Sequence, residues 1–315
     1  MNSTTLTDLK SKAASLLLGL AVGDALGVPV EFRPRGSFRV TGMQGYGTHN
    51  QPPGTWSDDT SLTLCLADSL ARGFSLGDLA RNFIRWHDEG AFTAHGTGFD
   101  IGIATSKAIR RLKAGIAPEE AGCTQVNENG NGSLMRIAPL VFYLADRPEA
   151  ERFSITKAVS SITHAHTWSV AACFLYLEYL RKLLGGMDRN TAYRELQGDF
   201  PEGTSAIGGN TLDKFSRMLR TDISTLPESA VKSGGFVVDT LEAAFWCFLS
   251  TDSYQSAVLK AVNLGDDTDT TAAVTGALAG LTYGITAIPP VWLESLAGYG
   301  EILRLSGAMA EALTP

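Results

Sequence analysis

Cysteine is scarce in this chain: there are four residues in 315, and no two of them form a CxxC pair. Structural zinc sites and secreted disulfide frameworks need closely spaced or numerous cysteines, so neither is predicted. Basic residues are outnumbered, with 26 Lys and Arg against 33 Asp and Glu and a net charge of −7. This balance argues against a nucleic-acid backbone as a partner, so any phosphate must be held by metal ions, backbone N–H groups or a few cations.

A targeting signal is also missing, since the first residues lack a basic start and an apolar run. We therefore expect a cytoplasmic location. One uncharged stretch, from Thr270 to Leu293, is long enough to cross a bilayer. Several glycines and the Pro289-Pro290 pair interrupt it, and an acidic cluster precedes it, which predicts a buried core helix and no membrane contact.

Linkers, short repeats and clear strand patterns are absent, which predicts one mostly helical domain over residues 1–315. A first helix is expected to begin at Thr7 or Asp8. Apolar residues at helical spacing predict further helices over 58–72, 76–87, 100–113, 168–184, 189–197, 208–220, 236–249, 254–264 and from 270 onward. Residues 33–54 are rich in Gly, Pro and Thr and predict a long loop, a type of segment that often serves as a lid.

Two acidic clusters stand at predicted helix starts. The first, GTWSDDT at 54–60, contains Asp58 and Asp59, and the second, GDDTDT at 265–270, contains Asp267 and Asp269. Carboxylates held close together raise one another's pKa unless a cation neutralises them. Oxygen ligands of this kind suit Mg²⁺, Mn²⁺ or Ca²⁺ rather than zinc. We favour one metal site shared by both clusters over two unrelated helix caps.

Three other features carry chemistry. Asp24 follows Leu17 and Leu20 on the apolar face of the first helix, so it needs hydrogen-bond donors or a metal, unless it caps the turn at Gly27. The Gly/Asn loop through 131–133 is expected to open a helix over 134–141 and to offer backbone N–H groups to an anion. The basic run through 107–113 is typical of a solvated helix face, with contact to a phosphate as the alternative.

Five blocks in register resemble the ADP-ribosylglycohydrolase family, which includes dinitrogenase-reductase-activating glycohydrolase. They are GDALG at 23–27, SDDT at 57–60, NGSLMR at 131–136, TH at 163–164 and GDDTDT at 265–270. The match runs from about residue 12 to residue 284. The resemblance implies an all-α, single-domain orthogonal bundle with a binuclear Mg²⁺ or Mn²⁺ centre that removes ADP-ribose from a modified side chain.

The resemblance also implies residue roles, carried over by position. Metal ligands would be Ser57, Asp58, Asp59 and Asp269 for one ion, and Asp267, Asp269 and Thr270 for the other. Substrate contacts to the distal ribose and diphosphate would come from Asp100, Gly102, Asn131, Gly132, Ser133 and His164. The catalytic candidates are Glu31, Asp59 and Asp24, with Glu31 or Asp59 as the base. The family usually has Thr at position 57 and often Gly at position 266.

The predicted reaction is hydrolysis of ADP-ribosyl-arginine on a protein, because the block Phe99-Asp100-Ile101-Gly102 looks like the arginine-specific branch. Serine-linked, nucleobase-linked and free ADP-ribose derivatives are alternative substrates. Two alternative functions belong to other classes: a non-catalytic, crystallin-like binder of ADP-ribose or metal, and a two-metal phosphohydrolase. The partner would be an ADP-ribosylated protein or a small molecule that contains ADP-ribose, and the chain is expected to be a monomer.

Overall fold

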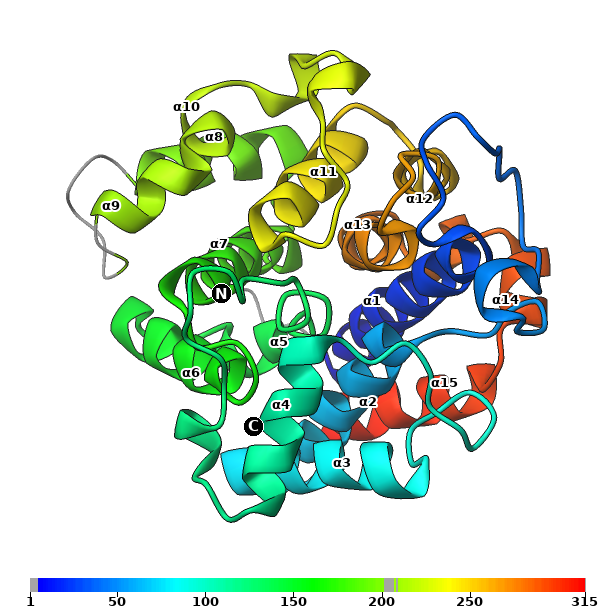
Figure 1. Ribbon diagram of the computed structural model, residues 1–315. Coiled ribbons are helices and arrows are strands. Elements are labelled where there is room, and N and C mark those ends of the chain that lie inside the picture. Colours follow the sequence, from blue (N-terminus) through cyan, green and yellow to red (C-terminus); the bar gives the residue numbers. More distant parts are fainter. Residues whose placement is uncertain (1–4, 201–206, 208, 315) are drawn as a thin grey trace.

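The computed structural model describes residues 5–200, 207 and 209–314. Over these residues the chain forms helices and loops, with three isolated β-bridges and no extended strand, so the predicted all-α fold is confirmed (Figure 1). The α-helices are α1 Leu6–Gly27, α2 Asp58–Ala71, α3 Leu76–Glu89, α4 Ile103–Lys113, α5 Leu140–Leu144, α6 Glu149–Ser161, α7 Thr167–Leu184, α8 Arg189–Asp199, α9 Gly209–Leu212, α10 Ser216–Arg220, α11 Val237–Leu249, α12 Tyr254–Val262, α13 Thr268–Tyr283, α14 Pro290–Ser295 and α15 Tyr299–Ala312.

Helices α1 and α13 cross the centre of the bundle side by side and antiparallel (Figure 1). A Cβ atom added at Gly276 would lie 2.2 Å from the carbonyl oxygen of Gly19, so a side chain there would force the helices apart. Gly27 approaches Asp269 just as closely, at 2.3 Å from an added Cβ to the Asp269 Cα. This contact sets the end of α1 against the start of α13 and brings the sequence around Asp24 to the second acidic cluster.

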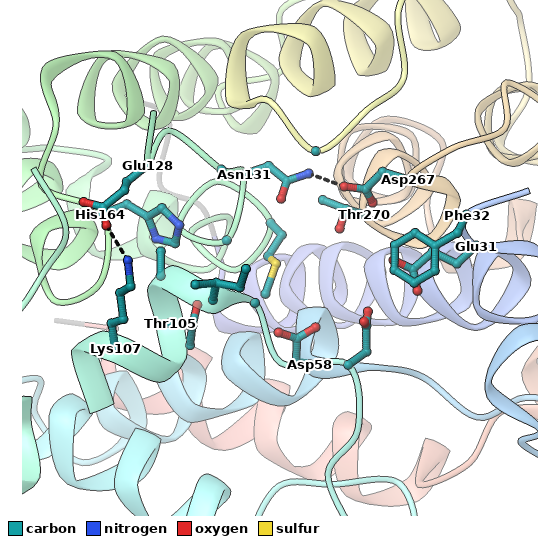
Figure 2. Close-up of a pocket in the computed structure, with 18 of the residues that line it drawn as sticks. Glu31, Phe32, Asp58, Thr105, Lys107, Glu128, Asn131, His164, Asp267 and Thr270 are labelled. Atoms are coloured by element: carbon teal, nitrogen blue, oxygen red, sulfur yellow. Dashed lines mark hydrogen bonds and ion pairs between the residues drawn. The ribbon is translucent and has the colours of Figure 1, made fainter. Parts of the chain in front are cut away.

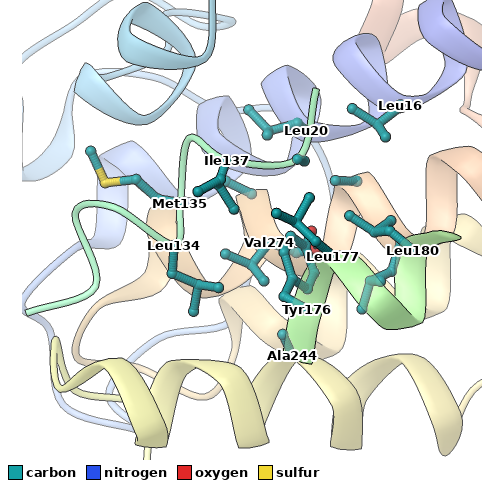
Figure 3. Packing of buried hydrophobic residues seen from close by; sticks show 14 of the residues in the cluster. Leu16, Leu20, Leu134, Met135, Ile137, Tyr176, Leu177, Leu180, Ala244 and Val274 are labelled. Atoms are coloured by element: carbon teal, nitrogen blue, oxygen red, sulfur yellow. The ribbon is translucent and has the colours of Figure 1, made fainter. Parts of the chain in front are cut away.

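The core extends from this pair to α7 and α11. Figure 3 shows the apolar side chains that surround it, and they come from α1, α7, α11, α13 and the segment before α5. Tyr176 is fully buried in this core, and its hydroxyl donates to the carbonyl oxygen of Val274 at 2.8 Å. A buried phenol needs such a partner, so this bond allows α7 to pack directly on α13.

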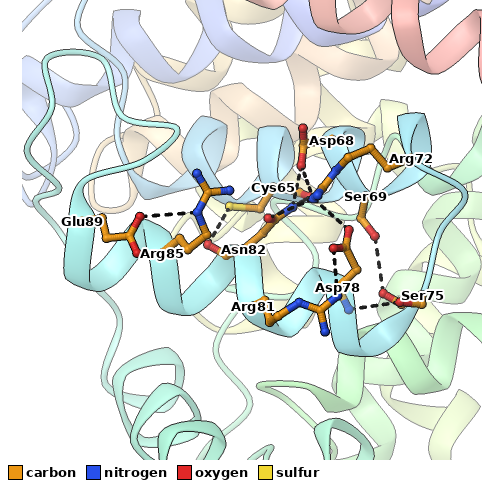
Figure 4. A network of polar contacts seen from close by, with 10 residues as sticks. All are labelled: Cys65, Asp68, Ser69, Arg72, Ser75, Asp78, Arg81, Asn82, Arg85 and Glu89. Carbon is orange, nitrogen blue, oxygen red and sulfur yellow. Dashed lines mark hydrogen bonds and ion pairs between the residues drawn. The ribbon is translucent and has the colours of Figure 1, made fainter.

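A polar network joins α2 to α3 on the other side of α1 (Figure 4). The Asn82 amide donates to the carbonyl oxygen of Cys65 at 3.0 Å and to Asp68 at 2.9 Å. Arg72 links Asp68 to Asp78, at 2.5 and 2.9 Å. These contacts fix α2 from its C-terminal half, which holds its N-terminal half in place at the acidic cluster.

The run from Thr270 to Leu293 does not form one long helix. Its first part lies in α13, which is buried from Thr268 to Leu281, as predicted for a core helix. Among the described residues, the helical segment long and apolar enough to cross a membrane is instead Leu6–Val30, and the structure buries its most apolar window completely. Because every residue of α1 from Ala13 to Gly27 is buried, this apolar sequence is explained by its central place in the core.

Several predicted helix bounds were wrong. The first helix has Thr5 as its N-cap rather than Thr7 or Asp8. The helix predicted from residue 100 begins at Ile103, because Asp100 has a φ of 56° and cannot lie in a right-handed helix. The helix predicted over 208–220 is divided into α9, a 3₁₀ turn and α10, with residue 208 outside the described residues.

The segment over 134–141 is likewise not the continuous helix that the sequence predicted. It forms turns, and α5 begins only at Leu140. Pro139 disfavours a helical conformation at the preceding residue, and the Arg136 guanidinium donates to the carbonyl oxygen of Gly132, which a regular helix would have used internally. The loop at 131–133 therefore does not sit at the start of a long helix.

Candidate metal and substrate site

A cavity of about 500 Å³ opens between the start of α4, the loop at 127–132 and the starts of α2 and α13 (Figure 2). Its size suits a small organic ligand. The residues that line it are Glu31, Phe32, Asp58, Asp100, Gly102, Ile103, Ala104, Thr105, Lys107, Asn127, Glu128, Gly130, Asn131, Gly132, Met135, His164, Gly235, Asp267 and Thr270. Glu31, Asp58 and Asp267 lie toward one end, and His164, Lys107 and Glu128 lie at the other.

The two acidic clusters meet at this cavity although they are far apart in the sequence. The Thr270 hydroxyl donates to Asp59 Oδ2 at 3.3 Å, and the Ser57 hydroxyl donates to the same oxygen at 3.2 Å. Ser57 is also the N-cap of α2. Glu31, Asp267 and Asp269 each bring a carboxylate oxygen within 4.8 Å of the others. The structure thus brings together the residues that the sequence proposed for one metal site.

Three buried carboxylate oxygens in this cluster have no hydrogen-bond partner: Asp59 Oδ1, Asp267 Oδ1 and Asp269 Oδ2. A buried carboxylate without donors or a cation is strongly disfavoured, and burial accordingly raises the pKa of Asp58, Asp59, Asp267 and Asp269. Neighbouring carboxylates raise these pKa values further. The oxygen-only donor set and its unpartnered atoms fit hard divalent cations.

Asp24 is engaged differently from the other carboxylates. Its Oδ1 and Oδ2 accept from the Ser57 backbone N–H at 2.9 and 3.1 Å, and Oδ2 also accepts from the Thr60 N–H and hydroxyl. Burial still raises the pKa of Asp24 to about 6, although these bonds act against that shift. Asp24 orients the first turn of α2, so its geometry is that of a positioning residue. The alternative prediction, that the Asp24 side chain caps the turn at Gly27, was wrong.

Glu31 lies at the cavity edge in a second group of titratable side chains. Its Oε2 is 2.5 Å from His49 Nε2, and Asp100 completes a cluster in which ligand atoms lie within 4.8 Å of one another. Burial, followed by the charge of Asp100, raises the pKa of Glu31 to about 10. Without added positive charge the Glu31 carboxyl is therefore protonated at neutral pH, and the loop at 46–51 supplies the imidazole beside it.

Neutral polar groups line a further part of the cavity. Asn131 donates to Asp267 Oδ2 at 2.8 Å, which ties the loop to the acidic end. Gly132 faces the His164 ring, and a Cβ there would lie 2.8 Å from its Cε1 atom. Burial lowers the pKa of His164 to about 3, so this ring is neutral and can donate or accept one hydrogen bond. Of the predicted substrate contacts, only Ser133 does not line the cavity.

Ser133 lies behind the cavity wall instead. Its hydroxyl accepts from Ser160 at 3.0 Å and is fully buried. The sequence did not single out Thr105, whose buried hydroxyl lines the cavity with no partner, or His49 beside Glu31. Thr105 stands two residues past the start of α4, but a single Thr on a basic helix is no signal. Nothing in the sequence marks His49, because it reaches Glu31 through the fold of a long loop.

The chain is similar to known proteins in sequence and in fold. The family model for ADP-ribosylglycohydrolase matches residues 5–315. ADP-ribosylarginine hydrolase Tri1 of Pseudomonas putida is 35% identical over 299 residues, which cover 94% of this chain and 76% of that protein. ADP-ribosyl-(dinitrogen reductase) glycohydrolase of Rhodospirillum rubrum is 31% identical, with 90% of each chain covered.

A solved structure agrees with these sequence matches. The ADP-ribosylglycohydrolase-related protein complex superposes with a TM-score of 0.82 and 34% identity, over 98% of this chain and all of that one. The likeness therefore extends over the helical architecture as a whole. The family model, the relatives and the fold all agree. This chain belongs to the ADP-ribosylglycohydrolase family.

Proposed function

We propose that this chain hydrolyses the bond between ADP-ribose and an arginine side chain of a modified protein. The observation that carries the proposal is the cluster of buried, unpartnered carboxylate oxygens at one end of a ligand-sized cavity. A relative 35% identical over most of this chain is named an ADP-ribosylarginine hydrolase, which supports arginine as the acceptor. A cytoplasmic location remains part of the proposal.

The proposed cofactor is a pair of Mg²⁺ or Mn²⁺ ions. Ser57, Asp58, Asp59 and Asp269 would hold one, and Asp267, Asp269 and Thr270 the other. Such ions, when bound, supply positive charge that polarises substrate hydroxyls and activates water. The three unpartnered oxygens of Asp59, Asp267 and Asp269 support this set, because each would gain a partner.

In the proposed reaction the hydroxyl of a water molecule bonds to the anomeric carbon of the distal ribose while the carbon–nitrogen bond to the guanidine breaks. The proton of the water passes through a carboxylate to the leaving guanidine. Glu31 or Asp59 serves as this base. Glu31 reaches its basic form once nearby positive charge lowers its pKa. Nearby carboxylates stabilise the oxocarbenium-like state, as in glycosidases.

The test is mass spectrometry of the products from arginine-, serine- and nucleobase-linked ADP-ribose substrates and free ADP-ribose derivatives, incubated with Mg²⁺, with Mn²⁺ or with EDTA. We expect intact ADP-ribose and unmodified arginine, formed only with a divalent ion. Release from serine alone would change the acceptor to the serine-linked alternative. Release of AMP would instead identify a phosphohydrolase, and binding of ADP-ribose without turnover would identify a non-catalytic binder.

A further inference from the structure

An ion pair closes the end of the cavity that lies farthest from the acidic cluster. Lys107 projects from α4, and its Nζ atom lies 2.8 Å from Glu128 Oε1 on the loop before Asn131 (Figure 2). Glu128 is held in place by the backbone N–H of Gln125, which donates to its other oxygen at 3.3 Å. Both residues line the cavity. The pair therefore spans the cavity wall between a helix and a loop.

Lys107 is the one Lys or Arg among the described residues that line this cavity. The acidic residues lining it are Glu31, Asp58, Asp100, Glu128 and Asp267. His164 adds no charge at neutral pH, because burial lowers its pKa to about 3. Arg136 is buried behind the wall, where it donates to the carbonyl oxygens of Gly132 and Val159. A diphosphate in the middle of the cavity would thus find one mobile cation within this lining.

The Lys107 side chain has the freedom that this role requires. It is 42% exposed, while its partner Glu128 is 18% exposed and fixed by its own loop. A lysine ammonium on four methylene groups can change partners by rotamer changes alone. The hydrogen bond between them raises the pKa of Lys107 and lowers the pKa of Glu128, so both groups are charged at neutral pH.

We infer that Lys107 is the residue of this site that recognises the diphosphate of ADP-ribose, and that Glu128 holds Lys107 when no diphosphate is present. The inference rests on the proposed function and extends it to a residue that selects the substrate. On binding, Lys107 leaves Glu128 and pairs with a phosphate oxygen, so Glu128 competes with the ligand. Carboxylate and diphosphate are alternative acceptors for the same donor.

This arrangement predicts effects of opposite sign at the two residues. Lys107→Gln removes the cation and weakens ADP-ribose binding by roughly tenfold, as expected for loss of one charge-assisted hydrogen bond. Glu128→Gln removes the competitor and strengthens binding by about threefold to tenfold. If the pair were only a strut between helix and loop, the two substitutions would both weaken binding. Lys107→Arg retains most of the affinity because it keeps the charge.

The experiment is isothermal titration of the full chain with ADP-ribose at a fixed Mg²⁺ concentration, at two NaCl concentrations. Lys113→Gln is the matched control, since Lys113 lies on the same helix, pairs with Asp88 at 2.7 Å and does not line the cavity. The expected result is weaker binding for Lys107→Gln with a smaller salt dependence, tighter binding for Glu128→Gln, and no change for Lys113→Gln.

Two results would overturn the inference: unchanged affinity in Lys107→Gln, or weaker affinity in both Lys107→Gln and Glu128→Gln. Circular dichroism of each variant checks that the helices are intact. Hydrolysis of ADP-ribosyl-arginine by the unsubstituted chain is measured in parallel. A chain that binds ADP-ribose as described but releases no arginine would contradict the proposed function and leave the role of Lys107 standing.

Discussion

At the scale of single residues, the second acidic cluster contains two aspartates with different roles, Asp269 in the site and Asp266 in the backbone turn before it. Asp269 is buried with an unpartnered oxygen, whereas Asp266 is exposed and has a φ of 60°. Glycine adopts that conformation freely, so a glycine would also fit at position 266. The backbone of Asp266 is what the fold uses, because its N–H donates to Arg33 and its carbonyl accepts from Phe32.

Asp269→Asn should therefore abolish most activity. The amide cannot supply the charge that holds a divalent ion, and loss of that charge is expected to slow hydrolysis on the order of a thousandfold. Asp266→Asn is the control, since asparagine tolerates a positive φ and its side chain lies outside the site. Steady-state hydrolysis and Mn²⁺ titration of both variants test this, and a fully active Asp269→Asn variant would remove the metal site from the mechanism.

Thr105 offers a test in which stability and binding should move in opposite directions. Its hydroxyl is buried at the cavity wall without a partner. Thr105→Val removes an unsatisfied polar group, so the free energy of unfolding should rise by about 1 kcal/mol. ADP-ribose affinity should fall by about tenfold if the ligand supplies the missing partner. Thermal unfolding and ligand titration measure the two effects, and a variant that binds normally would show that the hydroxyl serves no ligand.

At the scale of helices, the close contact of α1 and α13 controls the site from a distance. Gly276→Ala would place a methyl group 2.2 Å from the Gly19 carbonyl oxygen, so the helices must separate. We expect a loss of about 1–3 kcal/mol in unfolding free energy, together with weaker metal binding, because α13 carries Asp269. Gly307→Ala on α15 is the matched control, since nothing lies within 4 Å there, and it should stabilise the chain by about 0.5–1 kcal/mol.

How far the sequence reaches can also be judged at this scale. The acidic starts of α2 and α13 and the apolar spacing within each helix are local patterns, and they predicted a mostly helical chain in which the two acidic clusters meet. The pairings of Glu31 with His49 and of Lys107 with Glu128 depend on loops that fold back on the site, and local patterns carry no information about them. The loop after Gly132 was mispredicted because the Arg136 side chain takes a carbonyl that a helix would use.

At the scale of the whole molecule, the buried acidic cluster should make the stability of the metal-free chain fall as pH rises. Burial raises the pKa of Asp24 to about 6, so its folded form binds a proton more tightly than its unfolded form. This raised pKa stabilises the folded chain at pH values below about 4, the pKa of Asp in the unfolded chain. The stabilisation is lost as pH rises toward about 6, the pKa in the folded chain. For Asp24 alone the loss is about 3 kcal/mol.

His164 acts in the opposite sense, because its lowered pKa of about 3 means that acid favours the unfolded chain below about pH 6.5. The acidic cluster should still have the larger effect on the pH dependence of stability. The pKa values of its other aspartates are raised as well: Asp58, Asp59, Asp267 and Asp269. Thermal unfolding in EDTA between pH 5 and pH 7.5 tests this. We expect the melting temperature to fall with pH, and Mg²⁺ or Mn²⁺ to restore several degrees at pH 7.5. A rise with pH in EDTA would contradict it.

The bond between Thr270 and Asp59 joins residues 211 positions apart. A ribosome adding about 5–20 residues per second needs roughly 10–40 seconds to pass from one to the other. Throughout that interval α1 has no α13 to cover it, and the nascent chain exposes a long apolar helix. The acidic cluster can therefore form only during the last sixth of translation, and a chain that stops before α13 lacks half of it.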